Sequence, residues 1–165
     1  WLLACGVAGF LVWNWPKASV FMGDAGSMSL GLILVLFAYL GQSTAPKSLA
    51  IWGILSAVFW FDATITLLRR LIAGEAWMTA HKQHAYQRLH QAGWQVPHIV
   101  MGSIGLNVVL GLIALGVYYH RLSTGLGLGM ALGGLSLIYL WIERKKPMMI
   151  IEKEMQPVME SVGKV

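Results

Sequence analysis

Long stretches without charged residues constrain this chain more than any other feature of its sequence. Residues 25–46 carry no charge, and residues 48–68 carry only that of Asp62. Residues 98–119 and 124–142 also contain no Lys, Arg, Asp or Glu. A helix needs about 20 mostly apolar residues to cross a bilayer. Each stretch is long enough, and helices satisfy their own backbone in lipid, so the sequence predicts an all-α, multi-pass membrane protein.

We predict a single membrane domain that covers residues 1–165 and contains five spans. The chain opens at Trp1 inside an apolar run with no basic segment before it, which is not the pattern of a signal peptide. We therefore expect the first span to be the remainder of a longer helix and the chain to be part of a larger protein. The expected spans are about 1–13, 27–42, 48–68, 98–119 and 124–142, followed by a cytoplasmic tail at 143–165.

The composition excludes several other classes of protein. Hydrophobic residues make up 57% of the chain and charged residues 12%, against roughly 25% charged residues in soluble globular proteins. This excludes a soluble enzyme, a disordered tail and a nucleic-acid-binding domain, and no nucleic-acid partner is expected. Cys5 is the single cysteine, so the chain has no intrachain disulfide and no cysteine cluster for zinc.

The positions of Lys and Arg predict the orientation in the membrane. Of the 12 such residues, only Lys47 and Arg121 fall in the loops on one side, and the rest fall in residues 14–27, 69–97 and 143–165 on the other. Cytoplasmic loops carry the excess of positive charge. We therefore expect the larger loops, and any polar chemistry, on the cytoplasmic face of the membrane.

The segment 21–27, Phe-Met-Gly-Asp-Ala-Gly-Ser, predicts a tight turn that leads into a helix. Gly23 and Gly26 permit backbone angles that are closed to other residues. The free amides at a helix N-terminus bind phosphate, and Asp24 is an oxygen ligand of the kind that Mg²⁺ prefers. The alternative is structural, because Asp24 or Ser27 would also serve as an N-cap.

A second group of polar residues begins at Asp62, an ionisable residue inside an expected span. Such residues are costly in lipid and are usually functional or paired. Arg69 and Arg70 follow two helical turns later, near the cytoplasmic end of the span. They are candidates for binding phosphate, although anchoring of the helix at the membrane surface is the alternative.

Three further residues recur at helical spacing in the loop after this span. His81, His84 and Arg88 are separated by three and four residues, so one helical face would carry all three. Two histidines do not make a full zinc site. A face that binds phosphate or handles protons fits these residue types better.

The first motif lies in a longer pattern, Asn14-x-Pro16-x-Ala18-x-x-Phe21-Met-Gly-Asp-x-Gly-Ser-x-x-Leu-Gly. It resembles the signature of the polyprenyl-phosphate N-acetylhexosamine-1-phosphate transferases. The resemblance implies that Asp24 is a ligand of Mg²⁺, with Mn²⁺ as an alternative metal. It also implies that Asn14 and Phe21 lie at the nucleotide end of the pocket, where Phe21 would stack on uracil.

The loop from Ala80 to Leu89 resembles the same family. Many members carry His-x-His-His-Arg-Leu there, and alignment on Arg88 matches His84 with the first histidine, whereas Tyr86 and Gln87 replace the others. The run is similar to the branch that makes O-antigen and capsule lipid carriers. The resemblance implies catalytic roles for Asp24, His84 and Arg88, and substrate binding by Asn14, Phe21, Gly23, Gly26, Ser27, Arg69, Arg70 and His81.

The implied reaction moves a sugar 1-phosphate from a UDP-sugar to polyprenyl (undecaprenyl) phosphate and releases UMP, which initiates O-antigen or another cell-envelope polysaccharide. The family also uses an adjacent acidic pair that is absent here. We therefore expect this chain to be roughly the C-terminal half of such an enzyme and to be inactive alone. A non-catalytic membrane fragment is the main alternative, a small transporter or channel is a second, and a homodimer is left open.

Overall fold

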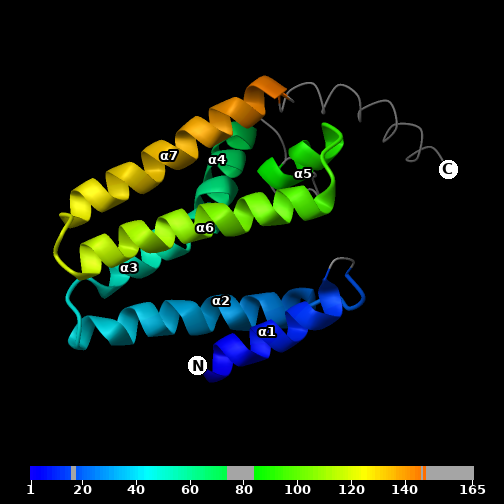
Figure 1. Cartoon of the computed structure of the whole chain (residues 1–165). Helices are drawn as coiled ribbons and strands as arrows, with labels where there is room; N and C mark the ends of the chain where they lie inside the picture. The colour runs from blue at the N-terminus through cyan, green and yellow to red at the C-terminus, as the bar shows by residue number, and fades with distance from the viewer. Residues whose placement is uncertain (16–17, 74–83, 146, 148–165) are drawn as a thin grey trace. The chain divides into compact units, whose positions relative to one another are not determined.

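The computed structural model describes residues 1–15, 18–73, 84–145 and 147, and every regular element in these ranges is a helix (Figure 1). The chain divides into an N-terminal unit, residues 1–46, and a C-terminal unit, residues 47–165. The helices are α1 (Leu2–Asn14), α2 (Gly23–Leu40), the short 3-10 helix η1 (Gly41–Ser43), α3 (Ser48–Leu55), α4 (Ala57–Ala73), α5 (Ala85–Gln91), α6 (Val96–Tyr118) and α7 (Thr124–Lys145).

The N-terminal unit has almost no interior. Among its described residues only Ala38 is buried, and α1 has no buried residue at all. Apolar side chains from α1 and α2 line a shallow groove between the two helices. Such uniformly apolar surfaces are typical of helices that are covered by lipid rather than by protein.

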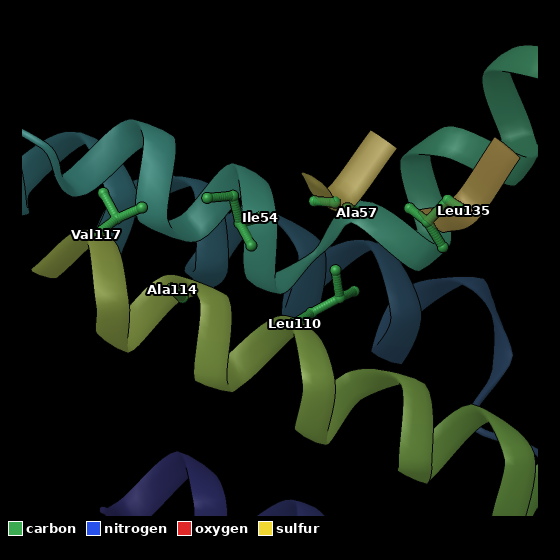
Figure 2. Packing of buried hydrophobic residues seen from close by; sticks show 7 residues of the cluster. Ile54, Ala57, Leu110, Ala114, Val117 and Leu135 are labelled. Carbon is green, nitrogen blue, oxygen red and sulfur yellow. The ribbon is translucent and has the colours of Figure 1, made fainter. Parts of the chain in front are cut away.

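The C-terminal unit holds the apolar core (Figure 2). On α6 the core residues are spaced four and three apart, and on α7 they are four apart, so each helix turns one stripe inward. Ile54 and Ala57 enter between them from the α3–α4 junction. The buried cluster consists of Ile54, Ala57, Leu110, Ala114, Val117, Ala131 and Leu135.

Helices α3 and α4 meet at a bend of 72° rather than forming the straight span expected over residues 48–68. Ser56 ends α3, and its hydroxyl donates to the carbonyl of Trp52 at 2.7 Å, a bond that bends helices. The bend also leaves the carbonyl of Gly53 to accept the indole N–H of Trp60 at 2.9 Å. The Trp60 indole therefore serves as the donor to Gly53, whereas the Ser56 hydroxyl adds a second bond to Trp52 beside the backbone N–H of Ser56 at 3.0 Å.

The described helices support an integral membrane protein. Three of them are long and apolar enough to cross a bilayer, and the bent pair α3–α4 brings the number to four if it counts as one span. The three are α2 with η1 (Gly23–Ser43), α6 and α7. Helix α1 has only 13 residues, so the predicted count of five spans is not reached by the described helices.

Close packing between α6 and α7 occurs at Gly127 of α7. Gly125, Gly129 and Gly133 form a row on α7 of the type that lets helices approach. An added Cβ at any of them would meet no described atom within 4 Å. At Gly127, on the opposite face, an added Cβ would overlap Cγ2 of Val117, so this glycine permits the contact between α6 and α7.

Candidate functional site

In the N-terminal unit, Asn14 organises the turn that leads from α1 to the Gly-Asp-x-Gly-Ser motif. Its amide nitrogen donates to the carbonyl of Phe10 at 3.1 Å. Its Oδ1 accepts the backbone N–H groups of Ser19 at 2.9 Å and Val20 at 3.0 Å. Phe21 follows directly, with an exposed fraction of 93%. The side chain of Asn14 therefore shapes the loop that presents Phe21.

Asp24 lies in the first turn of α2 with an exposed side chain, and no described residue forms an ion pair with it. The N-cap is Met22, which makes no side-chain cap, and Ser27 Oγ donates to the Asp24 carbonyl at 3.3 Å. The capping alternative is therefore wrong for Asp24 and Ser27, because the helix begins before either of them. A carboxylate in this turn also interacts favourably with the helix dipole.

The two glycines of the motif serve different purposes. Gly23 has a φ of +66°, which L side chains rarely adopt, as the sequence predicted. Gly26 is an ordinary helical residue, so the expectation of a special backbone angle is wrong there. A Cβ at Gly26 would instead lie 2.5 Å from Cγ of Met22, so the absence of a side chain makes room for Met22.

In the C-terminal unit, Asp62 on α4 binds the start of α5. Its Oδ2 lies 3.0 Å from Nδ1 of His84, and its Oδ1 accepts the backbone N–H of Ala85 at 3.0 Å. The side chain of Gln87 accepts the backbone N–H of His84 at 3.2 Å. Both side chains of the pair are partly exposed, Asp62 by 20% and His84 by 30%. The carboxylate at Nδ1 therefore fixes the orientation of the His84 ring.

Arg69 and Arg88 are brought together by Glu143, the first residue of the predicted cytoplasmic tail. Arg69 binds Glu143 in a forked arrangement, with Nη2 3.0 Å from Oε1 and Nη1 2.6 Å from Oε2. Nη1 of Arg88 donates to the same Oε2. Both guanidinium groups also lie over the ring of Tyr139, Arg88 at 4.8 Å and Arg69 at 5.9 Å from its centroid.

Burial separates the roles of these arginines. The side chain of Arg88 is fully enclosed, whereas that of Arg69 is 35% exposed. An enclosed guanidinium that is bonded to a carboxylate does not bind a substrate phosphate while this pairing lasts. Arg70 is also buried, with 2% exposure. Of the three predicted arginines, Arg69 is thus the one with an accessible edge. The predicted site residue His81 lies outside the described residues.

The described residues contain no group of three or more His, Cys, Asp and Glu that could hold a metal ion. In phosphoryl-transfer sites Mg²⁺ is commonly held by one or two carboxylates together with waters and the phosphates of the substrate. Asp24 is exposed, has no described counter-ion and lies at a helix N-terminus, so its environment fits such a ligand.

Sequence comparison relates the chain to known proteins. Residues 1–42, which include both Asn14 and Asp24, match the model for glycosyl transferase family 4. A probable undecaprenyl-phosphate N-acetylglucosaminyl 1-phosphate transferase of Bacillus subtilis is 34% identical over 52% of this chain. A decaprenyl-phosphate N-acetylglucosaminephosphotransferase of Mycobacterium leprae is 27% identical over 75% of it.

A phospho-N-acetylmuramoyl-pentapeptide-transferase of Maricaulis maris is 32% identical over 69% of the chain. These alignments cover 24%, 35% and 30% of the lengths of the three relatives. No solved structure matches the chain significantly. The family model and the three relatives describe the same kind of enzyme, and together they support the family of polyprenyl-phosphate hexosamine-1-phosphate transferases for this chain.

Proposed function

We propose that this protein transfers an N-acetylhexosamine 1-phosphate from a UDP-sugar to undecaprenyl phosphate, releases UMP and so initiates O-antigen or a related cell-envelope polysaccharide. The proposal is carried by Asp24, an exposed carboxylate without a described counter-ion in the first turn of a long apolar helix. It lies within the segment that matches the family. The excess of Lys and Arg in the larger loops favours the cytoplasmic face of the inner membrane for the reaction.

Phosphoryl transfer requires positioning and neutralisation of charge more than covalent participation by the protein. Mg²⁺, with Mn²⁺ as a substitute, would supply positive charge at the diphosphate of the UDP-sugar when Asp24 holds it. The start of α2 adds the partial positive charge of a helix N-terminus close to Asp24. Phe21, exposed just before this helix, offers its ring to the uracil base.

The second group of residues would serve the acceptor phosphate. Arg69 has an exposed edge and a planar group that matches phosphate oxygens. His84, oriented through Nδ1 by Asp62, would bind the lipid phosphate or accept a proton from it. Gly23, Gly26 and Ser27 are assigned to shaping the turn near the diphosphate.

The test is Asp24→Asn in membranes from cells that express the complete gene. Asparagine keeps the size of the side chain, and no cap is at stake, so the amount of folded protein should not change. Turnover of UDP-sugar with polyprenyl phosphate should fall by about 100-fold or more, and the Mg²⁺ concentration for half-maximal rate should rise. Wild-type turnover with unchanged Mg²⁺ dependence would contradict the assignment of Asp24.

A further inference from the structure

Glu143 belongs to α7 rather than to a separate tail after it. It lies in the last turn of α7, and its carboxylate joins Arg69 of α4 to Arg88 of α5. Its side chain is only 21% exposed. One carboxylate therefore connects α7 to two helices whose contacting residues lie 55 and 74 positions earlier in the sequence.

Tyr139 extends this connection by one helical turn. It lies on the same face of α7 as Glu143, with 8% exposure, beneath both guanidinium groups. An aromatic face attracts a guanidinium, and the attraction grows where water is excluded. The last turns of α7 thus present a ring and a carboxylate that together fix the two arginines in place.

Helix α5 depends on these contacts for its position. It has only seven residues, and a helix of this length is not stable by itself in water. Asp62 holds its beginning through His84 and Ala85, and Glu143 holds its centre through Arg88. Because Arg88 lies four residues after His84, displacement of Arg88 would also displace His84.

We propose that Glu143 is a positioning residue of the transfer reaction, which fixes Arg88 and thereby holds α5 and His84 in place. The same carboxylate orients Arg69, which leaves the remaining N–H donors of its guanidinium for phosphate. Arg88 then acts through the structure rather than by touching the substrate. The inference rests on the proposed function, because it assigns Glu143 to the support of His84 and Arg69.

The decisive variants are Glu143→Gln, Arg88→Met and the two combined, assayed in membranes with the rate divided by the amount of folded protein. Glu143→Gln leaves the charge of Arg88 enclosed and without its carboxylate, so kcat should fall about tenfold or more. The KM for the UDP-sugar should stay within about twofold, because Glu143 does not act on the nucleotide.

Addition of Arg88→Met to Glu143→Gln should raise kcat by about threefold or more over Glu143→Gln alone. Methionine removes the enclosed charge and fills the space over Tyr139. If Arg88 instead touches the substrate, its removal will lower kcat further in the Glu143→Gln background, which would overturn the inference. The direction of this one change therefore separates a positioning arginine from a substrate-binding one.

Further variants cover the other outcomes. Arg144→Gln, an exposed neighbour on the same turn, is the control and should behave as wild type. If Glu143→Gln does not fold, Glu143→Asp, which keeps the charge, should fold and give an intermediate kcat. The inference fails if Glu143→Gln or Glu143→Asp lowers only the amount of folded protein and leaves kcat unchanged. A wild-type protein without any transfer activity would contradict the proposed function instead.

Discussion

The two groups of polar residues in this protein differ in whether their carboxylates are bonded to other described side chains. In the N-terminal unit, Asp24 is exposed and no described residue pairs with it. In the C-terminal unit, Asp62 and Glu143 are each bonded to a side chain from another helix. An open carboxylate is suited to a ligand that comes and goes, such as a metal with its nucleotide. Paired carboxylates are suited to holding other groups still.

The same difference appears in the packing. The buried apolar cluster belongs entirely to the C-terminal unit, whereas Ala38 is the one buried residue among those described in the N-terminal unit. Substitutions in the first region should therefore affect turnover with little effect on folding. Substitutions in the second should affect both, in proportions that the contacts of each residue predict.

The largest effect in the C-terminal unit is expected from Asp62→Asn. The amide keeps the size of the side chain but removes the charge that orients His84 through Nδ1. We expect turnover to fall about 100-fold, since partners that orient a reactive imidazole have effects of this size or larger. Unlike the loss in Asp24→Asn, this loss should not be relieved by excess Mg²⁺. Relief by Mg²⁺ would show that Asp62 belongs to the metal site and would remove the contrast between the two regions.

A smaller effect is expected at Asn14, where two variants separate two roles. Asn14→Asp retains an oxygen that accepts the N–H groups of Ser19 and Val20, whereas Asn14→Ala loses it. If Asn14 mainly shapes the loop, alanine should lower turnover about tenfold and aspartate should lower it much less, because a lost turn-forming bond costs roughly 1 kcal/mol or more. Equal losses in both variants would instead indicate contact between the Asn14 amide group and the nucleotide.

The sequence predicted the helices well and their partners poorly. Helices α6 and α7 cover nearly the same residues as the expected spans 98–119 and 124–142, because a long apolar run is a local signal that can be read from the sequence. The bend at Ser56 escaped prediction, since it involves side-chain hydrogen bonds from Ser56 and Trp60 to backbone carbonyls of α3. Glu143 was missed because its partners lie 55 and 74 residues away, and no local pattern in one sequence reports such a pairing.

The glycines of α7 test the packing of the C-terminal unit. Gly127→Ala introduces a Cβ that would overlap Val117 and lie 3.4 Å from Cδ1 of Ile54. Overpacking of this kind costs about 1–3 kcal/mol, so the variant should melt at a lower temperature in detergent. Gly129→Ala is the matched control, because a Cβ there meets no described atom, and its melting temperature should equal that of wild type or exceed it slightly. The opposite order would place the helix contact on the other face of α7.

The smallest effect is expected at His90, which lies in α5, the helix that begins directly after His84, but has a different environment. His90 is exposed, and its Nδ1 lies 3.1 Å from the carbonyl of Trp94 in the turn that ends the helix. Gly93, with a φ of +90°, and the backbone bond from Trp94 to Leu89 already close this turn.

His90→Ala therefore removes one exposed bond and should change turnover by less than about twofold. His84→Ala, six residues earlier, removes the imidazole that Asp62 holds and should lower turnover about as much as Asp62→Asn. Measured side by side on folded protein, the two alanine variants compare an exposed histidine of α5 with the histidine before this helix that is bonded to Asp62. If His90→Ala has the larger effect, α5 would present its other end to the substrate, and the role given to Glu143 would have no basis.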